Sequence, residues 1–539
     1  MLVTEASSPA PGSPTQGSPA QGIAAGYAFA TPALELGAVS VSGQVDPDAK
    51  VRIPLSMMNR HGLVAGATGT GKTKTLQLMA EQLSSNGVPV VMADIKGDLS
   101  GLSRAGTSND KINERSRQTG DDWQAAAHPV EFVSLGSEGI GVPIRATITS
   151  FGPILLSKVL GLNATQESTL GLIFHWADKK GLPLLDLKDL RSVIAFLTGD
   201  EGKAELKGIG GVSRQTAGVI LRALSNLEAD GGDTFFGEPE VDPADLIRVA
   251  PDGRGIITLF ELGTAAARPA LFSTFLMWIL ADLFEFLPEV GDLDKPKLVF
   301  IFDESHLLFD DASKAFVDQV VQTVKLIRSK GVGVFFCSQL PTDIPNEVLS
   351  QLGARVQHAL RAFTPDDQKA LRTTVKTYPV SEVYDLEQAL TSLGTGEAVV
   401  TVLSERGAPT PVAWTVIRAP RSAMEAIGGD AITAAAKAGP LYAKYGSPVD
   451  RESAYEMLAA NTLAPGEPAD APAPAPAPPP APVPTPPRAP APESAPEGPG
   501  LLTEVLTSKP MQSFLRSAAS AAGREFSRAI FGTGRRRRR

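Results

Sequence analysis

Short apolar runs alternate with stretches of helical periodicity along most of the chain. The runs are rich in β-branched and aromatic residues, which is typical of strands buried on both faces. The predicted strands are Val88–Ala93, Gly255–Leu262, Leu298–Phe302, Gly333–Ser338 and Arg355–Phe363, followed by two late runs, Gly396–Leu403 and Pro411–Ile417. The predicted helices are Lys74–Ser84, Pro269–Leu287, Ser313–Arg328 and Asp366–Val375. This alternation predicts an α/β fold with a mainly parallel sheet and right-handed crossovers.

The distribution of proline, glycine and apolar residues divides the chain into regions. Residues 1–24 have few large apolar side chains and are expected to be a disordered N-terminal segment. Residues 25–450 are expected to form one globular domain, in which about 150–250 break the α/β rhythm as a helical insertion. Residues 451–499 are expected to be a linker, because they become rich in alanine and proline. Residues 500–539 place apolar side chains at helical spacing among arginines, which predicts a basic amphipathic tail.

The most apolar window, Ala270–Leu287, allows two interpretations. A membrane span is one of them, but the uninterrupted apolar part is short, and Asp282 and Glu285 fall within the helix. A buried helix is therefore the preferred interpretation.

A candidate phosphate site follows the apolar stretch Leu63–Ala65, which runs into the pattern G-x-x-x-x-G-K-T and then into a helical stretch. The glycines let backbone N–H groups face phosphate oxygens, and the helix directs its positive N-terminus at the same anion. Lys72 is expected to reach the β- and γ-phosphates, and the Thr73 hydroxyl to bind Mg²⁺. The predicted phosphate-binding loop consists of Gly66, Ala67, Thr68, Gly69, Thr70, Gly71, Lys72 and Thr73.

A second predicted strand, Leu298–Phe302, ends in two adjacent carboxylates, Asp303 and Glu304. Ligands of a doubly wound sheet bind at the carboxyl ends of its strands. Asp303 is therefore a candidate for organising Mg²⁺, and Glu304 for orienting or activating the water that attacks the γ-phosphate. A strand that merely ends in solvated acids is the alternative, and the phosphate-binding loop upstream favours the catalytic interpretation.

Gln339 follows the next predicted strand, Gly333–Ser338. A neutral amide at this position could hydrogen-bond to the γ-phosphate or to the attacking water, so Gln339 is a candidate sensor of the nucleotide. The alternative is a glutamine that only shapes a turn.

Several separated stretches resemble the HerA/FtsK clade of ATPases, and most closely its YjgR-like branch. They are Asn59-Arg60-His61 ahead of the phosphate-binding loop, Asp94-Ile-Lys-Gly-Asp98, Phe302–His306, Ser338–Pro341, Asp230–Glu238, Leu326–Gly333 and Arg355–Thr364. The likeness covers about residues 25–420. It implies a RecA-like core of the additional-strand, catalytic-glutamate type, with ATP and Mg²⁺ as ligands. It also implies assembly as a hexameric ring that pumps DNA.

Ring ATPases complete each site with an arginine from the neighbouring subunit, which stabilises charge during phosphoryl transfer. The candidates are Arg60, Arg328, Lys330, Arg355 and Arg361. Arg60 and Arg328 are preferred, because they resemble basic positions of the clade before the loop strand and before the Gln339 strand. Ordinary surface salt bridges are the alternative for each.

Contacts with other molecules are harder to place. The polar loop 96–118 carries Arg104, Lys111, Arg115 and Arg117, and in a ring it could contact the phosphates of double-stranded DNA without reading sequence. A solvated loop is the alternative. The basic tail could bind a partner protein, nucleic acid or an anionic membrane, or could dock on the ATPase core.

Charge and cysteine content narrow the class of protein. The net charge is −9 although the last five residues are arginines, which excludes a uniformly basic protein that coats nucleic acid. Cys337, the single cysteine, lies in an apolar run and cannot form an internal disulfide, so a cytoplasmic location is expected. The main hypothesis is an ATP-hydrolysing motor, a ring that acts on DNA as a translocase or helicase. The alternative is a nucleotide-dependent assembly switch or partner ATPase without a DNA track, which could be peripheral to a membrane.

Overall fold

The computed structural model describes residues 18–463, except 95–96, 138, 201, 206–209, 262–268, 292 and 311. The chain divides into two compact units, residues 1–454 and residues 455–539. The linker beyond residue 463 and the predicted amphipathic tail lie outside the described residues.

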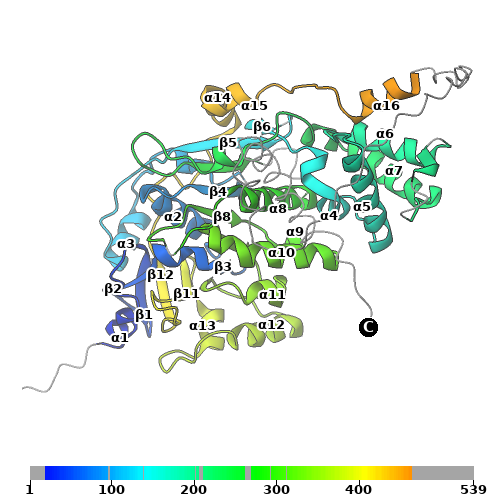
Figure 1. Cartoon of the computed structure of the whole chain (residues 1–539). Helices are drawn as coiled ribbons and strands as arrows, with labels where there is room; N and C mark the ends of the chain where they lie inside the picture. The colour runs from blue at the N-terminus through cyan, green and yellow to red at the C-terminus, as the bar shows by residue number, and fades with distance from the viewer. Residues whose placement is uncertain are drawn as a thin grey trace, which may run out of the picture. The chain divides into compact units, whose positions relative to one another are not determined.

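A sheet of twelve strands forms the centre of the first unit (Figure 1). Its strands are β1 (Ala33–Val41), β2 (Gln44–Pro54), β3 (Gly62–Ala65), β4 (Val90–Asp94), β5 (Val130–Leu135), β6 (Val142–Ile144), β7 (Ile257–Glu261), β8 (Leu298–Phe302), β9 (Val332–Ser338), β10 (Ala354–Gln357), β11 (Glu397–Thr401) and β12 (Ala413–Ile417). Their order is β2-β1-β12-β11-β10-β3-β9-β8-β4-β7-β5-β6. All pairs from β10 to β6 are parallel, and those from β2 to β10 are antiparallel.

The predicted α/β fold with a mainly parallel sheet is confirmed. Strands β4, β7, β8 and β9 coincide with predicted strands to within about two residues, and β11 and β12 lie inside the two late runs. β10 ends at Gln357, well before the predicted Phe363. The chain leaves the sheet there because His358 and Ala359 make backbone hydrogen bonds to Ala65 and Ala67 of the loop region instead.

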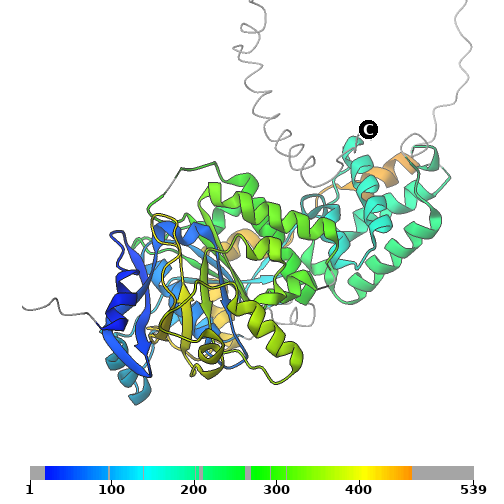
Figure 2. The same ribbon diagram turned by 90° about the horizontal axis from the view of Figure 1, so that it is seen from below.

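Four helices lie where helical periodicity predicted them: α2 (Lys72–Ser85), α8 (Pro269–Phe286), α10 (Lys314–Ile327) and α12 (Pro365–Val375). Helix α2 contacts β1, β3 and β4, whereas α8 and α10 pack side by side against β8 and β9 (Figure 2). Most described side chains of α8 are buried, which agrees with the preferred interpretation of the apolar window. Among the described residues, no helix has both the length and the apolar character needed to cross a membrane.

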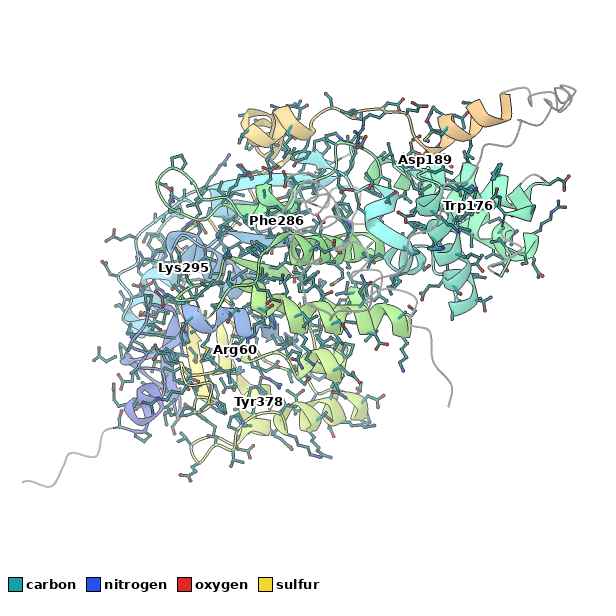
Figure 3. The ribbon with its side chains drawn as sticks, in the orientation of Figure 1. Arg60, Trp176, Asp189, Phe286, Lys295 and Tyr378 are labelled. Atoms are coloured by element: carbon teal, nitrogen blue, oxygen red, sulfur yellow. The ribbon has the colours of Figure 1, made fainter. Side chains whose placement is uncertain are left out.

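The region expected to be a helical insertion contains α4 (Ile148–Val159), α5 (Ala164–Lys179), α6 (Leu187–Thr198) and α7 (Arg214–Ala229). Asn163 and Asp186 start α5 and α6 with capping boxes, in which side chains satisfy N–H groups of the first turn. Helices α5, α6 and α7 pack on one another, and α4 joins them to α8. Trp176 of α5 stacks on Phe196 of α6, with ring centroids 5.5 Å apart (Figure 3).

The remaining helices are short: α1 (Pro19–Ala25), α3 (Asp110–Thr119), α9 (His306–Phe309), α11 (Asn346–Leu349), α13 (Leu386–Ser392), α14 (Gly429–Ala438), α15 (Pro440–Tyr445) and α16 (Ala454–Leu463). Helix α1 begins inside the segment 1–24 that was expected to be disordered and ends one residue beyond it. Ser18 caps it, and Ala20 and Ile23 bury their side chains. Helix α16 likewise falls inside the expected linker 451–499. Helix α3 occupies the end of the expected loop 96–118.

Candidate nucleotide-binding site

The phosphate-binding loop connects β3 to α2 at the carboxyl edge of the parallel strands. Gly66, Gly69 and Gly71 have φ values of 152°, 78° and 114°, which L-residues with side chains rarely adopt. A Cβ at Gly66 would lie 2.5 Å from the Cβ of His358, and one at Gly71 would lie 3.1 Å from the nitrogen of Gly396. The loop therefore needs glycine at Gly66 and Gly71 for close packing as well as for conformation.

Lys72 is the first residue of α2 and is almost fully buried, with 8% of its surface exposed. Its ammonium group donates to the carbonyl oxygens of Gly66, at 2.6 Å, and Ala67, at 3.3 Å. Helix α2 starts from Gly71 without a side-chain cap, so N–H groups of its first turn remain available to an anion. Loop, lysine and helix start together form an anion-binding cradle.

The carboxylate pair follows β8 and is fastened to the neighbouring strand. The Ser305 N–H and hydroxyl both donate to the carbonyl oxygen of Cys337 on β9, at 2.8 and 2.9 Å. The Glu304 N–H donates to Asp303 Oδ1 at 2.9 Å, and Glu304 has a left-handed φ of 45°. A side-chain oxygen of Glu304 lies 3.5 Å from His306 Nδ1. This tight turn fixes where both carboxylates leave the strand.

Strand β9 lies between the loop strand β3 and the carboxylate strand β8. Its last residues contact the segments that follow both strands. The Gly66 N–H donates to the Ser338 carbonyl oxygen at 3.2 Å, and Ser305 donates to Cys337 as described above. Burial raises the pKa of the Cys337 thiol well above its ordinary value. Asp303 and Glu304 raise it further, and Lys72 opposes them. The segments that carry these three residues are both bonded to the end of β9, through Gly66 on one side and Ser305 on the other.

Gln339 directly follows β9 at the same edge and is exposed. Thr73 lies in the first turn of α2 and is half-buried. The sequence-predicted residues Lys72, Thr73, Asp303, Glu304 and Gln339 thus all lie at the carboxyl ends of three adjacent strands.

His358 was not assigned a role from the sequence, although it lies in one of the stretches that resembled the clade. Its Nδ1 lies 2.8 Å from the Glu397 carbonyl oxygen, which can only accept, so Nδ1 carries the proton. Its Nε2 therefore accepts from the Thr75 hydroxyl of α2 at 2.9 Å. Complete burial lowers the pKa of His358 to about 4, so the ring is neutral at pH 7. A neutral histidine fits a site where Lys72 already supplies positive charge.

Two further buried acids, Asp94 and Glu261, end the adjacent strands β4 and β7 in register with each other. Burial raises the pKa of Asp94 to about 6 and that of Glu261 to about 8, and the Asp94 charge adds to the second shift. Asp94 accepts from the backbone N–H groups of Asp98, at 3.1 Å, and Leu99, at 2.7 Å. The first residue of the Asp94–Asp98 motif therefore shapes the turn after β4. Among the described residues, no group of three or more His, Cys, Asp or Glu is arranged to hold a metal ion.

A groove of about 680 Å³ opens at the amino ends of β3, β9 and β10. Arg60 and Tyr378, both labelled in Figure 3, belong to its lining. No carboxylate is among the described residues that line it. Its cationic side chains are Arg60, Lys325, Arg328, Arg355 and Lys376. We call this feature the basic groove.

The basic groove and the phosphate-binding loop lie at opposite edges of the sheet. Strand β3 starts just after Arg60 and ends at the loop, and Arg328 precedes β9 in the same way. The structure therefore does not bring Arg60 or Arg328 to the loop of their own chain. Of the other candidate cations, Lys330 lies 5.2 Å above the ring of Phe284, and Arg361 is exposed.

The structure changes the interpretation of the polar segment 96–118. Arg115 turns inward and donates to backbone carbonyls of residues 395, 396 and 417. Arg117 stays at the surface and pairs with Glu114, and Lys111 is exposed. Arg115 is therefore unsuited to contact DNA, because its guanidinium is already bonded within the protein.

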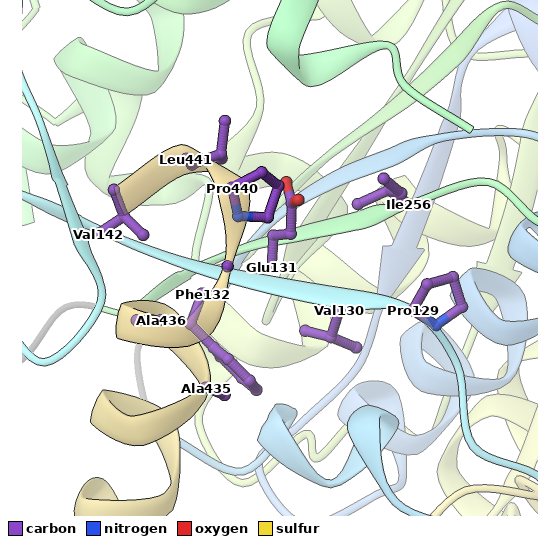
Figure 4. A pocket seen from close by; sticks show the side chains of 11 residues that line it. Pro129, Val130, Glu131, Phe132, Val142, Ile256, Ala435, Ala436, Pro440 and Leu441 are labelled. Carbon is purple, nitrogen blue, oxygen red and sulfur yellow. The ribbon is translucent and has the colours of Figure 1, made fainter. Parts of the chain in front are cut away.

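A second cavity, of about 230 Å³, is mainly apolar and lies between β5 and the helices α14 and α15 (Figure 4). Val130 and Phe132 line it from the strand, and Ala436 and Leu441 from the helices. None of the predicted site residues lines it. It is a packing gap beside the sheet and not part of the nucleotide site.

A parallel sheet in which an extra strand separates the loop strand from the carboxylate strand defines a RecA-like P-loop protein. Residues 40–539 match the family described as Helicase HerA-like C-terminal, and the chain belongs to this family. The predicted resemblance to the HerA/FtsK clade is thereby confirmed, whereas the closer likeness to its YjgR-like branch stays a prediction.

The chain is 25% identical over 369 residues to the DNA double-strand break repair helicase HerA of Sulfurisphaera tokodaii, which covers 68% of this chain and 66% of that protein. It thus spans just under two thirds of that relative. A shorter match, 36% identical over 116 residues, is to the probable helicase MJECL08 of Methanocaldococcus jannaschii and covers 21% of this chain and 20% of that protein. Among solved structures, the bacterial conjugative coupling protein TrwBdeltaN70 aligns with a TM-score of 0.48 and 16% identity, covering 75% of this chain and 94% of that one. VirB4 of Thermoanaerobacter pseudethanolicus aligns with a TM-score of 0.45 and 16% identity, covering 72% and 96%.

Proposed function

We propose that the protein is an ATP-hydrolysing motor that acts on double-stranded DNA as an oligomeric ring. The observation that carries the proposal is the placement of Lys72, Asp303 and Glu304 at the carboxyl ends of adjacent strands, on either side of the end of β9, in a member of the HerA-like family. Relatives over most of this domain are named as helicases of DNA double-strand break repair.

The ligands that fit the site are ATP and Mg²⁺. The loop backbone, the start of α2 and Lys72 supply donors and positive charge to phosphate oxygens. Mg²⁺ is usually held in such sites by one or two protein oxygens together with substrate phosphates, and the Thr73 hydroxyl and the Asp303 carboxylate are oxygens of this kind. When bound, the metal neutralises charge on the phosphates. Asp303 then has the role of a ligand of Mg²⁺.

Glu304 is the candidate base, because it leaves the end of the carboxylate strand beside Asp303 and hydrolysis needs a group that orients water. Gln339 is exposed one residue beyond β9 and can donate to a γ-phosphate oxygen or to that water. We assign Glu304 to activation of water and Gln339 to sensing of the γ-phosphate.

The basic groove supports a role for its arginines in a neighbouring subunit. Arg60 and Arg328 line a groove whose described lining residues include no carboxylate, at the edge of the sheet opposite to their own phosphate-binding loop. In a ring with head-to-tail contacts, that edge of one subunit can face the nucleotide of the next. We assign Arg60 and Arg328 to stabilising phosphate charge in trans, and Arg355 joins them as a third candidate.

The test of the motor is the rate of ATP hydrolysis with and without double-stranded DNA, at several salt concentrations. Stimulation that weakens as salt rises is expected, because contacts with DNA phosphates release counterions. The same assay without change on adding DNA would favour the alternative, a nucleotide-dependent switch or partner ATPase. Exposed Lys111 is the remaining DNA candidate on α3, because Arg117 already pairs with Glu114.

The basic tail, residues 500–539, is proposed to recruit a partner protein or an anionic membrane, on the strength of its sequence pattern alone. Removal of residues 500–539 should leave basal ATP hydrolysis unchanged and should weaken binding to anionic vesicles or to the partner. Equal vesicle binding by the full and shortened chains would remove the membrane from this proposal.

A further inference from the structure

A short turn, residues 394–397, packs against the phosphate-binding loop. The Gly396 N–H donates to the Thr70 carbonyl oxygen at 2.9 Å. The two backbones are so close that a Cβ at Gly71 would lie 3.1 Å from the Gly396 nitrogen and 3.2 Å from its Cα. The position of this turn therefore limits the positions that the loop can take.

The turn is also attached to the start of α2. The Glu397 carbonyl oxygen accepts from His358, and His358 accepts in turn from Thr75, as described above. The Glu397 carboxylate closes the turn internally, because its Oε2 accepts from the Gly394 N–H at 2.9 Å and from Trp414 Nε1 at 3.0 Å. The turn thus holds the phosphate-binding loop at one point and the helix that follows it at another.

Arg115 holds the same turn from a distant part of the chain. Its Nη1 donates to the carbonyl oxygens of Gly396 at 2.9 Å and Ile417 at 3.1 Å, and its Nη2 donates to that of Thr395 at 3.3 Å. Gly396 has a φ of +76°, and a Cβ there would lie 3.4 Å from both terminal nitrogens of the guanidinium. One planar guanidinium group therefore binds three backbone carbonyls. Among the described hydrogen bonds, these carbonyls accept from no other side chain.

We propose that Arg115 is a positioning residue for nucleotide binding: it holds the 394–397 turn against the phosphate-binding loop and so keeps the loop in its binding conformation. This inference rests on the proposed nucleotide site. It also connects that site to α3, the helix that occupies the end of the polar segment 96–118. A molecule that displaced α3 would move Arg115, and with it the 394–397 turn and the phosphate-binding loop.

The test compares Arg115→Ala with Arg117→Ala in the full chain. Arg117 lies half a turn away on the same helix but is 72% exposed and bonds only to Glu114 among the described contacts, so it is a matched control. Equilibrium binding of a fluorescent ATP analogue and the steady-state KM and kcat for ATP are measured for each variant. We expect Arg115→Ala to raise Kd and KM about ten-fold while kcat at saturating ATP changes by less than about two-fold, because the loop is misplaced and the reacting groups remain. Arg117→Ala should match the parent chain.

Two more variants keep the test decisive if Arg115→Ala does not fold. Arg115→Lys retains a cation that can reach one carbonyl, so it should recover part of the lost affinity. Gly396→Ala places a Cβ against the guanidinium in a left-handed conformation, so it should weaken nucleotide binding in the same direction. Nucleotide binding by Arg115→Ala or Gly396→Ala equal to that of the parent chain would overturn the inference, as would a fall in kcat with unchanged Kd. Failure of the parent chain itself to bind ATP would instead overturn the proposed function.

Discussion

Glu261 shows that the position of a carboxyl group decides its charge. It ends β7 with only 3% of its surface exposed, and burial beside Asp94 raises its pKa to about 8. Glu304, the candidate base, lies in the more exposed turn after β8, which is separated from β7 by one strand. From the sequence, the carboxylates after an apolar strand could be predicted as site residues. Their ionisation could not, because it depends on which strands flank them.

The raised pKa of Glu261 predicts a pH-dependent effect of Glu261→Gln. Glutamate in the unfolded chain ionises near pH 4.5, whereas the folded protein holds the proton up to about pH 8, so burial of Glu261 costs increasingly more as pH rises between these values. Glu261→Gln removes that cost. We expect it to gain about 1–3 kcal/mol over the parent chain at pH 8 and much less at pH 5, measured by urea unfolding.

The control for this measurement is Glu347→Gln, a change at an exposed glutamate of α11. A gain for Glu261→Gln that is equal at pH 5 and pH 8 would show that the effect comes from packing and not from ionisation.

Glu304→Gln separates binding from chemistry at the proposed base. The amide keeps the size and the left-handed turn but cannot accept a proton from water. We expect ATP binding to stay within about three-fold of the parent chain while kcat falls by about 10²–10⁴-fold. Hydrolysis by this variant at the parent rate would remove Glu304 from the mechanism.

At the scale of elements, the central parallel strands and the late strands β11 and β12 were predictable, whereas β1, β2 and the edge strands β5 and β6 were not. The burial of β8 and β9 leaves continuous apolar runs, whereas β2 contains Pro47 between two aspartates and has the pattern of a turn. Helix α3 was not predicted from the sequence, because it buries little besides Ile112 and therefore shows no apolar stripe. Pairing with β1 makes β2 regular, and packing on β2, β1 and β12 supports α3, so tertiary contacts rather than local pattern define both.

The pairing of β1 with β12 predicts a large cost for a methyl group at Gly37. A Cβ there would lie 1.9 Å from the Val416 carbonyl oxygen, and sheet backbone cannot move away as a flexible side chain does. We expect Gly37→Ala to lose about 1–3 kcal/mol of unfolding free energy in chemical denaturation. Gly22→Ala, where a Cβ within helix α1 meets nothing within 4 Å, is the control and should be neutral or gain up to about 1 kcal/mol, because alanine is the better helix former.

At the scale of the whole molecule, one sheet places two anion-attracting features, the phosphate-binding loop and the basic groove, at opposite edges. The carboxyl edge carries the proposed nucleotide site, whose residues the sequence could single out because each group of them directly follows an apolar strand. The basic groove at the amino edge could not be predicted as a unit. Arg60, Arg328 and Arg355 come from three separate segments, and only the strand order brings them together.

Action of the groove in trans predicts that two inactive variants restore each other. Lys72→Ala lacks a working phosphate-binding loop, and the double variant Arg60→Ala with Arg328→Ala lacks a working groove. When the two variants are mixed in equal amounts and reassembled, about a quarter of the subunit contacts should join an intact loop to an intact groove. The mixture should recover a comparable share of the parent ATPase rate. A mixture as inactive as its components would contradict action in trans.

Cys337 has a practical consequence. It is the only cysteine of the chain, it is buried at the end of β9, and its surroundings keep the thiol protonated. Maleimides react with exposed thiolates, so the native protein should take up such labels slowly. A cysteine introduced at exposed Arg117 would then be the one fast-reacting position in the chain. A fluorophore there would report on α3 during turnover without prior removal of a native cysteine.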